Sequence, residues 1–287
     1  MSVIIPAYRA ERFLAAALES VAGQTHYDWE VRIHEDGVYD NSAKVIDAFS
    51  AKHPGKVFHS SSVRNSGVSR TRNQLMDAAQ GDVIAFLDAD DLWLPEHLER
   101  ALAAIERNNA DWYVSAMREV DAQGQATGPE RFPPDVAPNE MAASLLSHNF
   151  IPTSLAVFGP RVVHSNFRFD PNLKVGEDLD LWIRLLGADL YPAKADRVTI
   201  LYRRHESNTT NDPVRFAEEF AKVFEKHLGN PNLPSGACLR GIDIMLNPVI
   251  RMTRWRAPHR ALCANFRRWR ARWRPAKVSS SFLKKNR

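Results

Sequence analysis

Short apolar segments alternate with amphipathic segments over residues 2–116, and this alternation constrains the fold more than any other feature of the sequence. The spacing of apolar residues predicts strands at residues 2–5, 29–34, 57–58, 82–87 and 112–116, and helices at residues 10–23, 40–51, 66–79 and 95–108. Strands that alternate with helices form a mainly parallel sheet with right-handed crossovers, and ligands bind outside the carboxyl ends of its strands. The sequence therefore predicts an α/β domain whose chemistry lies at those strand ends.

The composition is typical of a soluble chain with a sizeable core. Of the 287 residues, 44% are hydrophobic and 25% are charged, and the length suits one α/β domain with an appendage. The longest stretch without charged side chains, Met141–Pro160, is interrupted by polar residues and prolines, so no membrane-spanning helix is predicted. The chain begins without a basic and then apolar leader, and we expect it in the cytoplasm. Cys238 and Cys263 form no pattern typical of a disulfide framework or a zinc site.

Positive charge is concentrated at the end of the chain. Residues 244–287 hold 13 of the 38 basic side chains and none of the 34 acidic ones, so residues 1–243 carry 25 basic against 34 acidic side chains. Within this tail, an apolar stripe with helical spacing lies among arginines and consists of Leu262, Phe266, Trp269 and Trp273. A basic amphipathic helix with tryptophans binds anionic membrane surfaces, so we expect peripheral attachment at the inner face of the membrane. Packing of the tail on the body and a dimer contact are the alternatives, and no nucleic-acid-binding module is recognisable.

Carboxylates stand at the ends of two predicted strands. Glu35-Asp36-Gly37 follows the second strand, and Asp88-Ala89-Asp90-Asp91 follows the fourth. Residues two apart at a strand end project to the same side, so Asp88 and Asp90 are expected to face one pocket while Asp91 points away. Two hard oxygen ligands suit Mg²⁺ or Mn²⁺, which take further ligands from substrate phosphates. The pattern indicates a nucleoside diphosphate ligand, and the sequence lacks the glycine motifs of Rossmann dehydrogenases and P-loop NTPases.

Five motifs in sequence order make a more specific pattern. They are Val3-Ile4-Ile5-Pro6-Ala7-Tyr8, Glu35-Asp36-Gly37 with Asp40-Asn41-Ser42, Asn65-x-Gly67 with Arg72-Asn73, Phe86-Leu87-Asp88-Ala89-Asp90-Asp91, and Gly176-Glu177-Asp178. With these motifs, residues 2–205 resemble the family 2 glycosyltransferases of the GT-A fold. The resemblance implies a Rossmann-like, mainly parallel sheet flanked by helices. It also implies inverting transfer of a sugar from a nucleotide-sugar, usually a UDP-sugar, to a hydroxyl of a glycan or lipid-linked saccharide.

The resemblance also implies a division of the chain and a donor site. The GT-A catalytic domain would cover residues 1–212, with nucleotide-sugar binding at about 1–117 and the acceptor side at about 118–212. A helical extension would follow over 213–287 and be basic and amphipathic from about 244. The implied donor-binding residues are Pro6, Tyr8, Asp36, Arg72, Asp88 and Asp90. Tyr8 would stack near the base, Asp36 accept from the uracil imide, Asp88 lie near the ribose and Asp90 bind Mn²⁺ or Mg²⁺, while Arg72 would face the diphosphate or brace the loop.

Transfer to a hydroxyl needs a base, because the hydroxyl loses its proton during attack on the sugar. Asp178 is the candidate on the resemblance, and the neighbouring Glu177 is the residue most easily confused with it. A divalent ion on Asp90 would stabilise the charge that develops on the leaving diphosphate. His205, in the segment Tyr202-Arg203-Arg204-His205, is a candidate either for the metal or for the diphosphate.

Several positions depart from the family pattern. Arg9 stands where the family commonly has Asn, and Val38-Tyr39 replace a small pair, which leaves the donor open. The absence of a Q-x-x-R-W segment favours transfer of one sugar per encounter. A nucleotidyltransferase is disfavoured because no Gly-rich basic loop follows the first strand, and a non-catalytic sugar-nucleotide-binding protein is disfavoured by Asp178. On the acceptor side, residues 124–138 are predicted to form a surface loop. Phe150–Ser154 are predicted to pack in the fold, and lining of the acceptor side is the alternative.

Overall fold

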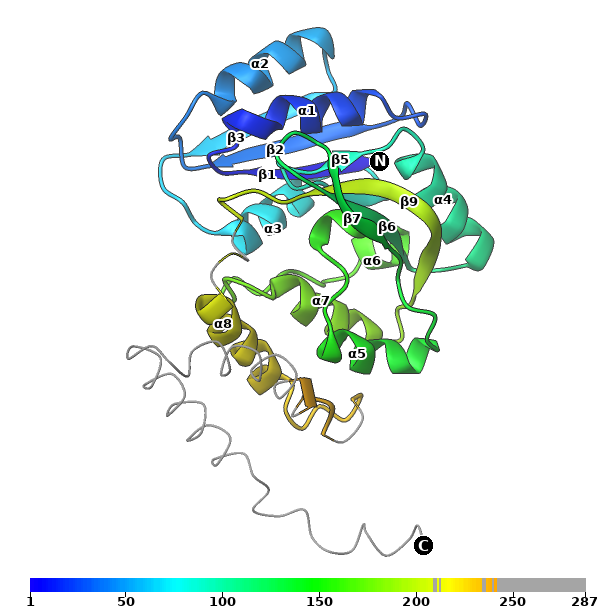
Figure 1. The fold of residues 1–287 in the computed structure, drawn as a ribbon. Coiled ribbons are helices and arrows are strands. Elements are labelled where there is room, and N and C mark those ends of the chain that lie inside the picture. Colours follow the sequence, from blue (N-terminus) through cyan, green and yellow to red (C-terminus); the bar gives the residue numbers. More distant parts are fainter. Residues whose placement is uncertain (209–210, 212, 234–235, 239, 242–287) are drawn as a thin grey trace, which may run out of the picture. The chain divides into compact units, whose positions relative to one another are not determined.

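The computed structural model describes residues 1–208, 211, 213–233, 236–238, 240 and 241 (Figure 1). The chain divides into two compact units, Met1–Ile242 and Asp243–Arg287. The predicted amphipathic helix from Leu262 to Trp273 lies outside the described residues. The first unit extends beyond residue 212, the end predicted for the catalytic domain, and includes the helix that follows.

A nine-stranded sheet runs through the described part of the first unit, in the order β3-β2-β1-β4-β8-β6-β9-β5, with β7 paired to β6. In chain order its strands are β1 (Ser2–Ala7), β2 (Glu30–Asp36), β3 (Val57–Ser62), β4 (Ile84–Phe86), β5 (Leu92–Trp93), β6 (Trp112–Val120), β7 (Ala126–Arg131), β8 (Ala156–Phe158) and β9 (Pro192–Arg203). The helices in the same residues are α1 (Glu11–Ala22), α2 (Ser42–Lys52), α3 (Val68–Ala78), α4 (His97–Asn108), α5 (Pro138–Ser147), α6 (Pro160–Val163), α7 (Glu177–Leu186) and α8 (Pro213–Lys226), with a 3₁₀ turn, η1, at Thr153–Leu155.

The first half of the sheet has the parallel order that the sequence predicts. β1 pairs in parallel with β2 and β4, and β2 pairs in parallel with β3. Helices α1 and α2 lie over one face of these strands and α3 lies over the other (Figure 1). Val3, Ile4 and Ile5 are therefore fully buried, as is usual for a strand covered on both faces. The edge strand β3 is longer than predicted because its polar residues after Phe58 are exposed and give no apolar signal.

The second half of the sheet is mixed. β8 runs antiparallel to β4 and β6, β9 runs parallel to β6, and β5 runs antiparallel to β9. The prediction of a surface loop over residues 124–138 is wrong in part, because β7 forms an antiparallel hairpin with β6. This strand escaped prediction because its side chains are mostly exposed and include Gly128 and Pro129. The α/β fold and its flanking helices are confirmed.

Helix α7 is held by aromatic packing and by α8. The rings of Trp112 in β6 and Trp182 in α7 are stacked with centroids 5.0 Å apart, and both side chains are fully buried. Gly176 precedes α7 with a φ of +79°, and a Cβ there would lie 3.0 Å from Val223 and 3.2 Å from Phe220 of α8. Because both the backbone conformation and the close approach require glycine, the start of α7 is fixed against α8.

Candidate active site

Asp36, at the carboxyl end of β2, is held by the loop that leads into α3. Its Oδ1 accepts hydrogen bonds from the Ser66 N–H at 2.6 Å and the Ser66 hydroxyl at 3.0 Å, and its Oδ2 accepts from the Gly67 N–H at 2.8 Å. Burial alone would raise the pKa of Asp36, but these donors lower it below its ordinary value. Asp36 is therefore ionised and accepts these hydrogen bonds. The sequence alone does not indicate that the donors come from the residues that precede α3.

Arg72, on α3, joins two distant parts of the chain. Its guanidinium lies 2.6 Å from Asp88 Oδ1 after β4 and 2.7 Å from Glu177 Oε1 at the start of α7. The Arg72 side chain is buried, and the two carboxylates raise its pKa although burial opposes this. The two ion pairs of Arg72 bring the Asp88–Asp90 segment next to the Glu177–Asp178 pair.

Asp90 and His205 meet at one point of the structure. Asp90 Oδ2 lies 2.9 Å from His205 Nε2, although the two residues are 115 positions apart. The His205 ring packs against Phe13 with centroids 4.7 Å apart. Burial and the neighbouring Asp88 raise the pKa of Asp90, against the lowering influence of His205. The Asp90–His205 pair therefore joins the end of β4 to the end of β9.

The backbone of this segment is fixed by Arg203. The Arg203 guanidinium donates to the Asp90 carbonyl at 2.7 Å, and the Arg203 N–H donates to Asp91 Oδ1 at 2.9 Å. Asp91 is 1% exposed, whereas the side chains of Asp88 and Asp90 are 29% and 31% exposed. Asp91 therefore points away from the open side, as predicted. The sequence does not indicate these contacts of Arg203, because the residue that stands out in this segment is the candidate ligand His205.

Asp178 lies at the start of α7 and is hydrogen-bonded through one carboxylate oxygen. Its Oδ1 accepts hydrogen bonds from the Leu179 N–H at 2.6 Å and from Asn149 Nδ2 at 3.2 Å. Burial, with the adjacent Glu177, raises the pKa of Asp178 to about 7, although the same hydrogen bonds and Arg72 act in the opposite direction. A carboxylate that titrates near neutral pH suits proton abstraction at that pH. Glu177 instead forms an ion pair with Arg72. The two adjacent carboxylates, which the sequence alone does not distinguish, therefore have different partners.

Exposed aromatic rings lie at the ends of β1 and β2. The rings of Tyr8 and Tyr39 meet edge to face, with centroids 5.6 Å apart and an interplanar angle of 83°. The Arg9 guanidinium lies 5.4 Å from each ring centroid. Tyr8 is 47% exposed and Tyr39 is 51% exposed. Pro6 lies at the end of β1, two residues before Tyr8.

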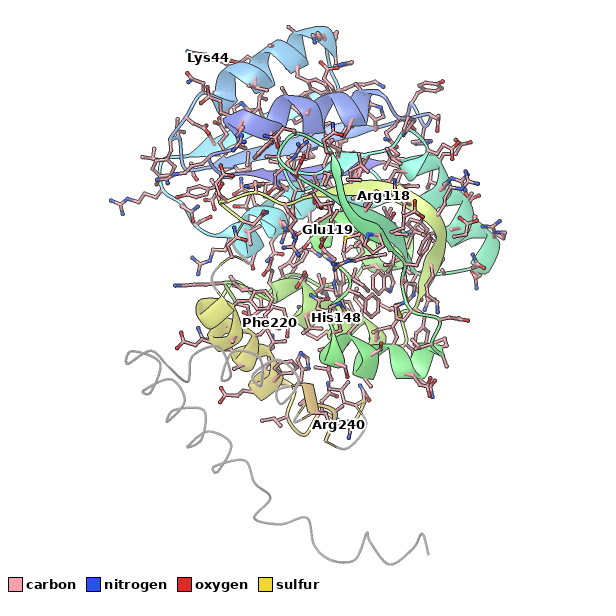
Figure 2. All side chains as sticks on the ribbon, in the orientation of Figure 1. Lys44, Arg118, Glu119, His148, Phe220 and Arg240 are labelled. Atoms are coloured by element: carbon pink, nitrogen blue, oxygen red, sulfur yellow. The ribbon has the colours of Figure 1, made fainter. Side chains whose placement is uncertain are left out.

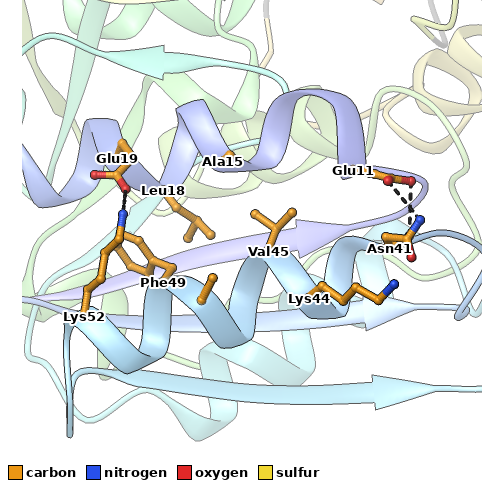
Figure 3. Close-up of a pocket in the computed structure, with 10 residues that line it drawn as sticks. Glu11, Ala15, Leu18, Glu19, Asn41, Lys44, Val45, Phe49 and Lys52 are labelled. Carbon is orange, nitrogen blue, oxygen red and sulfur yellow. Dashed lines mark hydrogen bonds and ion pairs between the residues drawn. The ribbon is translucent and has the colours of Figure 1, made fainter.

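Asp40 ties the starts of α1 and α2 together. Its carboxylate accepts from the Ser42 N–H and from the Glu11 N–H, each at 3.0 Å, and Glu11 in turn accepts from the Asn41 amide. A groove of 560 Å³ lies between the two helices (Figure 3). Among its lining residues are Leu18, Phe49 and the Lys52–Glu19 ion pair, and none of the predicted site residues lines it. This groove is therefore separate from the site around Asp36, Asp88, Asp90 and Asp178.

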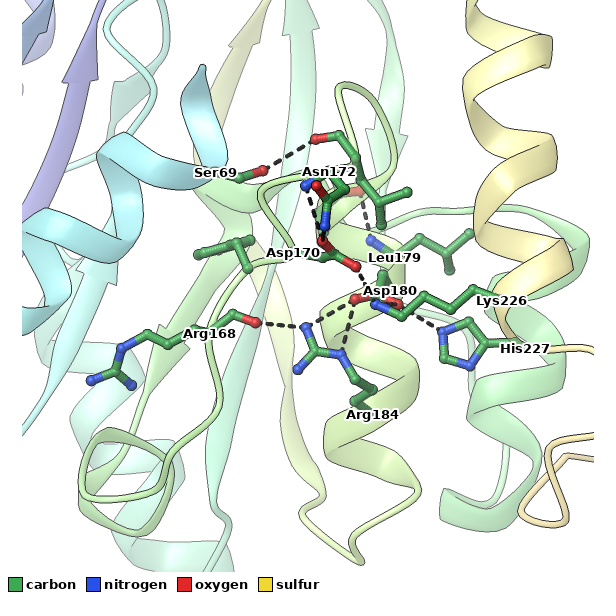
Figure 4. Close-up of polar contacts among 12 residues, drawn as sticks. Ser69, Arg168, Asp170, Asn172, Leu179, Asp180, Arg184, Lys226 and His227 are labelled. Atoms are coloured by element: carbon green, nitrogen blue, oxygen red, sulfur yellow. Dashed lines mark hydrogen bonds and ion pairs between the residues drawn. The ribbon is translucent and has the colours of Figure 1, made fainter. Parts of the chain in front are cut away.

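A buried charge cluster supports α7 from α8 (Figure 4). Asp180 is fully buried and lies 2.9 Å from Arg184, from Lys226 and from His227. These partners lower the pKa of Asp180 to about 2, although burial alone would raise it. Lys226 also lies 2.6 Å from Asp170 in the loop before α7. The cluster fixes the helix that begins with Glu177 and Asp178.

The β6–β7 hairpin lies beside the segment that carries His205. Glu119 lies 3.2 Å from Arg131 of β7 and 3.2 Å from Arg204, and Arg118 lies 2.6 Å from Glu130. Figure 2 labels Arg118 and Glu119 on β6. The ion pairs Glu119–Arg131 and Arg118–Glu130 hold β6 to β7. The ion pair Glu119–Arg204 holds β6 to the segment that follows β9.

Phe150–Ser154, for which packing is the favoured prediction and acceptor lining the alternative, run into η1. The Ser154 hydroxyl accepts a hydrogen bond from the Asp88 N–H at 3.0 Å, and Ser154 itself is fully buried. At least this end of the segment therefore supports the backbone of the Asp88–Asp90 segment and is closed to an acceptor.

Sequence comparison matches this chain to glycosyltransferases. The sequence model of glycosyl transferase family 2 matches residues 2–158. An uncharacterised glycosyltransferase of Rickettsia bellii is 26% identical over 255 residues, which cover 88% of this chain and 36% of the relative. The Escherichia coli UDP-Glc:alpha-D-GlcNAc-diphosphoundecaprenol beta-1,3-glucosyltransferase WfgD is 29% identical over 186 residues, which cover 65% of this chain and 69% of the relative. The matches to the relatives from Rickettsia bellii, Nostoc sp. and Rickettsia felis cover 36%, 54% and 38% of those proteins, so this chain spans about a third to a half of their lengths.

Two solved structures share the fold. Staphylococcus aureus TarS 1–349 in complex with UDP-GlcNAc has a TM-score of 0.64 at 20% identity and covers 87% of this chain and 72% of TarS 1–349. The mannosyltransferase PcManGT from Pyrobaculum calidifontis, in complex with GDP-Man and Mn²⁺, has a TM-score of 0.63 at 15% identity and covers 93% of this chain and 79% of that protein. Together with the ordered strand-end motifs, the match over more than half of the sequence shows that this chain belongs to glycosyl transferase family 2.

Proposed function

We propose that this protein transfers a sugar from a UDP-sugar to a hydroxyl of a glycan or lipid-linked saccharide, one sugar at a time and with inversion at the anomeric carbon. The observation that carries this proposal is the buried Arg72, which holds Asp88 at one strand end and Glu177, the neighbour of Asp178, at the start of α7. Donor-side and base-side carboxylates thereby face one region. The choice of a UDP-sugar is supported by two similar proteins, because WfgD is named for UDP-Glc and TarS was solved with UDP-GlcNAc.

Asp178 would act as the base through Oδ2. Both hydrogen bonds to its carboxylate reach Oδ1, and within the described ranges no residue donates to Oδ2. An acceptor hydroxyl that donates to Oδ2 would transfer its proton there as its oxygen attacks the anomeric carbon. The bond from that carbon to the diphosphate oxygen breaks on the opposite face, so the configuration inverts. With a pKa of about 7, Asp178 is substantially ionised at neutral pH and is still basic enough to accept the proton.

A divalent cation fits beside Asp90 and His205. No cluster of three or more metal-ligating side chains occurs in the portion of the chain that the structure describes. Asp90 Oδ2 and His205 Nε2 form a hydrogen bond of 2.9 Å, and a carboxylate oxygen and an imidazole nitrogen this close together could both bind one divalent ion. Mn²⁺ accepts this mixed oxygen and nitrogen pair, with phosphate oxygens among the remaining ligands. When bound, the ion would stabilise negative charge on the departing diphosphate. The presence of Mn²⁺ in the PcManGT complex supports this assignment.

Peripheral membrane attachment is part of the proposal. No described helix is long and apolar enough to span a bilayer. The 13 basic side chains of residues 244–287 and the stripe through Trp269 and Trp273 support attachment to an anionic surface. The full name of WfgD includes a diphosphoundecaprenol-linked saccharide, and a lipid-linked acceptor of this kind would place the substrate at such a surface.

Release of nucleoside diphosphate from a panel of UDP-, GDP- and dTDP-sugars tests the function. The assay is run with a mixture of lipid-linked and soluble saccharide acceptors, with Mn²⁺, with Mg²⁺ and with EDTA. We expect acceptor-dependent release of UDP in the presence of metal, and inverted stereochemistry in the product. Release of pyrophosphate from a sugar phosphate and nucleoside triphosphate would instead identify a nucleotidyltransferase. Tight binding of UDP-sugars without turnover with any acceptor would favour a binding protein.

A further inference from the structure

Two residues that depart from the family pattern lie together on the exposed donor side. Tyr39 follows β2 and Arg9 follows β1, and both contact Tyr8 as described above. Contacts among these two tyrosines and the arginine contribute little to the stability of the fold, because about half of each tyrosine remains exposed to water. Exposed aromatic groups of this kind are typical of a surface that binds a planar ligand.

The backbone beside Tyr39 leaves room for its ring. Gly37, the residue after Asp36, has a φ of +100°, and a Cβ there would clash with the Tyr39 ring. The Tyr39 ring therefore lies directly on bare backbone next to Asp36. Beyond Tyr39, Asp40 fixes the loop to the starts of α1 and α2 through the Glu11 and Ser42 N–H groups. The loop is thus anchored at both ends, while one side of the Tyr39 ring faces solvent.

Arg9 is held in an uncommon conformation beside the rings. Its φ is +52°, in the left-handed region that non-glycine residues seldom adopt. Its guanidinium lies 5.4 Å from the Tyr8 and Tyr39 centroids. The charge of Arg9 also helps to lower the pKa of the nearby Asp40, although among the residues that the structure describes no ion pair within 4.0 Å joins Arg9 to a carboxylate. A cation over an aromatic face is attracted to it. Because strain of this kind persists where the surroundings impose it and is common at ligand sites, Arg9 is a brace for the rings and not an ordinary surface arginine.

We propose that Tyr39 is a second donor-base contact, which packs against the nucleobase opposite Tyr8 and is braced by Arg9. This proposal rests on the proposed function, because it takes the ligand to be a nucleoside diphosphate. With rings edge to face and 5.6 Å apart, Tyr39 and Tyr8 leave no slot for a base, so Tyr39 turns outward when the base enters and then closes on it. The Arg9 and Tyr39 side chains thereby take the place of the smaller residues that the family commonly has at these positions, and they set how tightly the base is held.

Binding of UDP to the full chain, measured by calorimetry in the presence of Mn²⁺, tests this. Tyr39→Ala is expected to weaken UDP binding by roughly tenfold, as is usual for loss of one base-stacking ring, whereas Tyr39→Phe stays within about twofold because the ring remains. The matched control is Tyr27→Ala, which removes a tyrosine that is 77% exposed and outside the site, and it is expected to leave UDP binding unchanged. Inorganic pyrophosphate, which has no base, is expected to bind Tyr39→Ala as it binds the unaltered chain.

Arg9 is tested by a double-mutant cycle. Arg9→Ala is expected to weaken UDP binding, and its effect should be smaller in the Tyr39→Ala background because Arg9 acts through the ring. Additive effects would overturn the bracing role of Arg9. Unchanged or tighter UDP binding by Tyr39→Ala, or an equal loss of pyrophosphate binding, would overturn the base contact. If the unaltered chain binds UDP and these variants do not differ, only this inference fails; if the unaltered chain binds no nucleoside diphosphate, the proposed function fails as well.

Discussion

The Asn149 side-chain amide donates to Asp178 Oδ1 at 3.2 Å, while Asn149 Oδ1 accepts from the Ile151 N–H at 3.2 Å. Asn149 is thereby oriented by its own loop and in turn orients the carboxylate that we assign as the base. Because the second hydrogen bond to Asp178 also reaches Oδ1, the arrangement leaves Oδ2 for the substrate. Asn149 is a positioning residue, since it acts on the reaction through Asp178.

Asn149→Ala is expected to shift the pH dependence of transfer. The hydrogen bond from Asn149 lowers the pKa of Asp178, so its loss raises that pKa above about 7. A base must be deprotonated, and kcat/KM falls as the pH drops through its pKa; the acidic limb should therefore move to higher pH by roughly half a unit to one unit. The measurement is kcat/KM from about pH 5.5 to about pH 9, which brackets this limb. Asn108→Ala, which removes a side chain that bonds within α4, is the control and should leave the profile in place. A lower kcat with an unmoved acidic limb would contradict the role of Asn149.

Asp178→Asn and Glu177→Gln should separate two adjacent carboxylates. Asp178→Asn retains size and polarity but removes the base, so we expect transfer to fall by about 10²-fold or more with donor binding retained. Glu177→Gln leaves the buried Arg72 with one carboxylate fewer, and we expect weaker donor binding and a lower melting temperature. Single-turnover transfer, UDP-sugar binding and thermal unfolding are measured on both variants. Equal transfer by Asp178→Asn and the unaltered enzyme would move the base elsewhere.

His205→Ala should reveal what His205 binds. If His205 and Asp90 hold the metal, the variant needs a higher Mn²⁺ concentration for half-maximal activity, and excess Mn²⁺ restores part of the rate. A diphosphate contact would instead raise the KM for the donor at every Mn²⁺ concentration. His164→Ala, at an exposed histidine beside Asp82, is the control. EDTA is expected to abolish activity of the unaltered enzyme, and full activity in EDTA would reject the metal assignment at Asp90.

Asp180→Asn is expected to destabilise the protein, although Asp180 is not among the proposed substrate contacts. It leaves Lys226, Arg184 and His227 around a neutral side chain, which costs about 3 kcal/mol and lowers the melting temperature by roughly 10 °C at neutral pH. Because the folded pKa of about 2 lies below the ordinary 3.8, the ionised Asp180 stabilises the fold above pH 3.8, and this contribution is lost as the pH falls through 2. The gap in melting temperature between the two proteins should therefore narrow between about pH 5 and about pH 2. Asp196→Asn, at a side chain that is 78% exposed, should show no such gap.

Replacement of four tail arginines by glutamine should weaken membrane binding. The positions are Arg267, Arg268, Arg270 and Arg272. Each basic residue near an anionic surface contributes about 1 kcal/mol, so the variant should float far less with phosphatidylserine-containing vesicles than the unaltered chain. Binding of the unaltered chain should also fall as salt increases. Equal flotation of both proteins, or of neither, would contradict attachment through the tail.

The strand-end motifs are accessible to sequence reasoning, but the partners that position them are not. The sequence predicts strands β1 and β4 from continuous apolar runs and β2 from its alternation of apolar and polar residues. It also predicts the acidic residues at the end of β2 and after β4, because polar residues end a buried strand. The contacts Arg72–Glu177 and Asp180–His227 span 105 and 47 positions, and pairing over such distances depends on how helices pack. Asn149 stands in no motif, and the exposed side chains of β7 give no alternation to detect.

The close contact of Gly176 with Phe220 and Val223 limits where this chain can be joined to another glycosyltransferase in a chimeric protein. A chimera that joins residues 1–212 to the C-terminal part of another glycosyltransferase would keep Asp178. It would replace both the surface that contacts Gly176 and two of the partners of Asp180, Lys226 and His227. Such a hybrid would retain every motif and lose the support of its base. Exchange of tails between homologues is better made after Ile242, where the first compact unit ends.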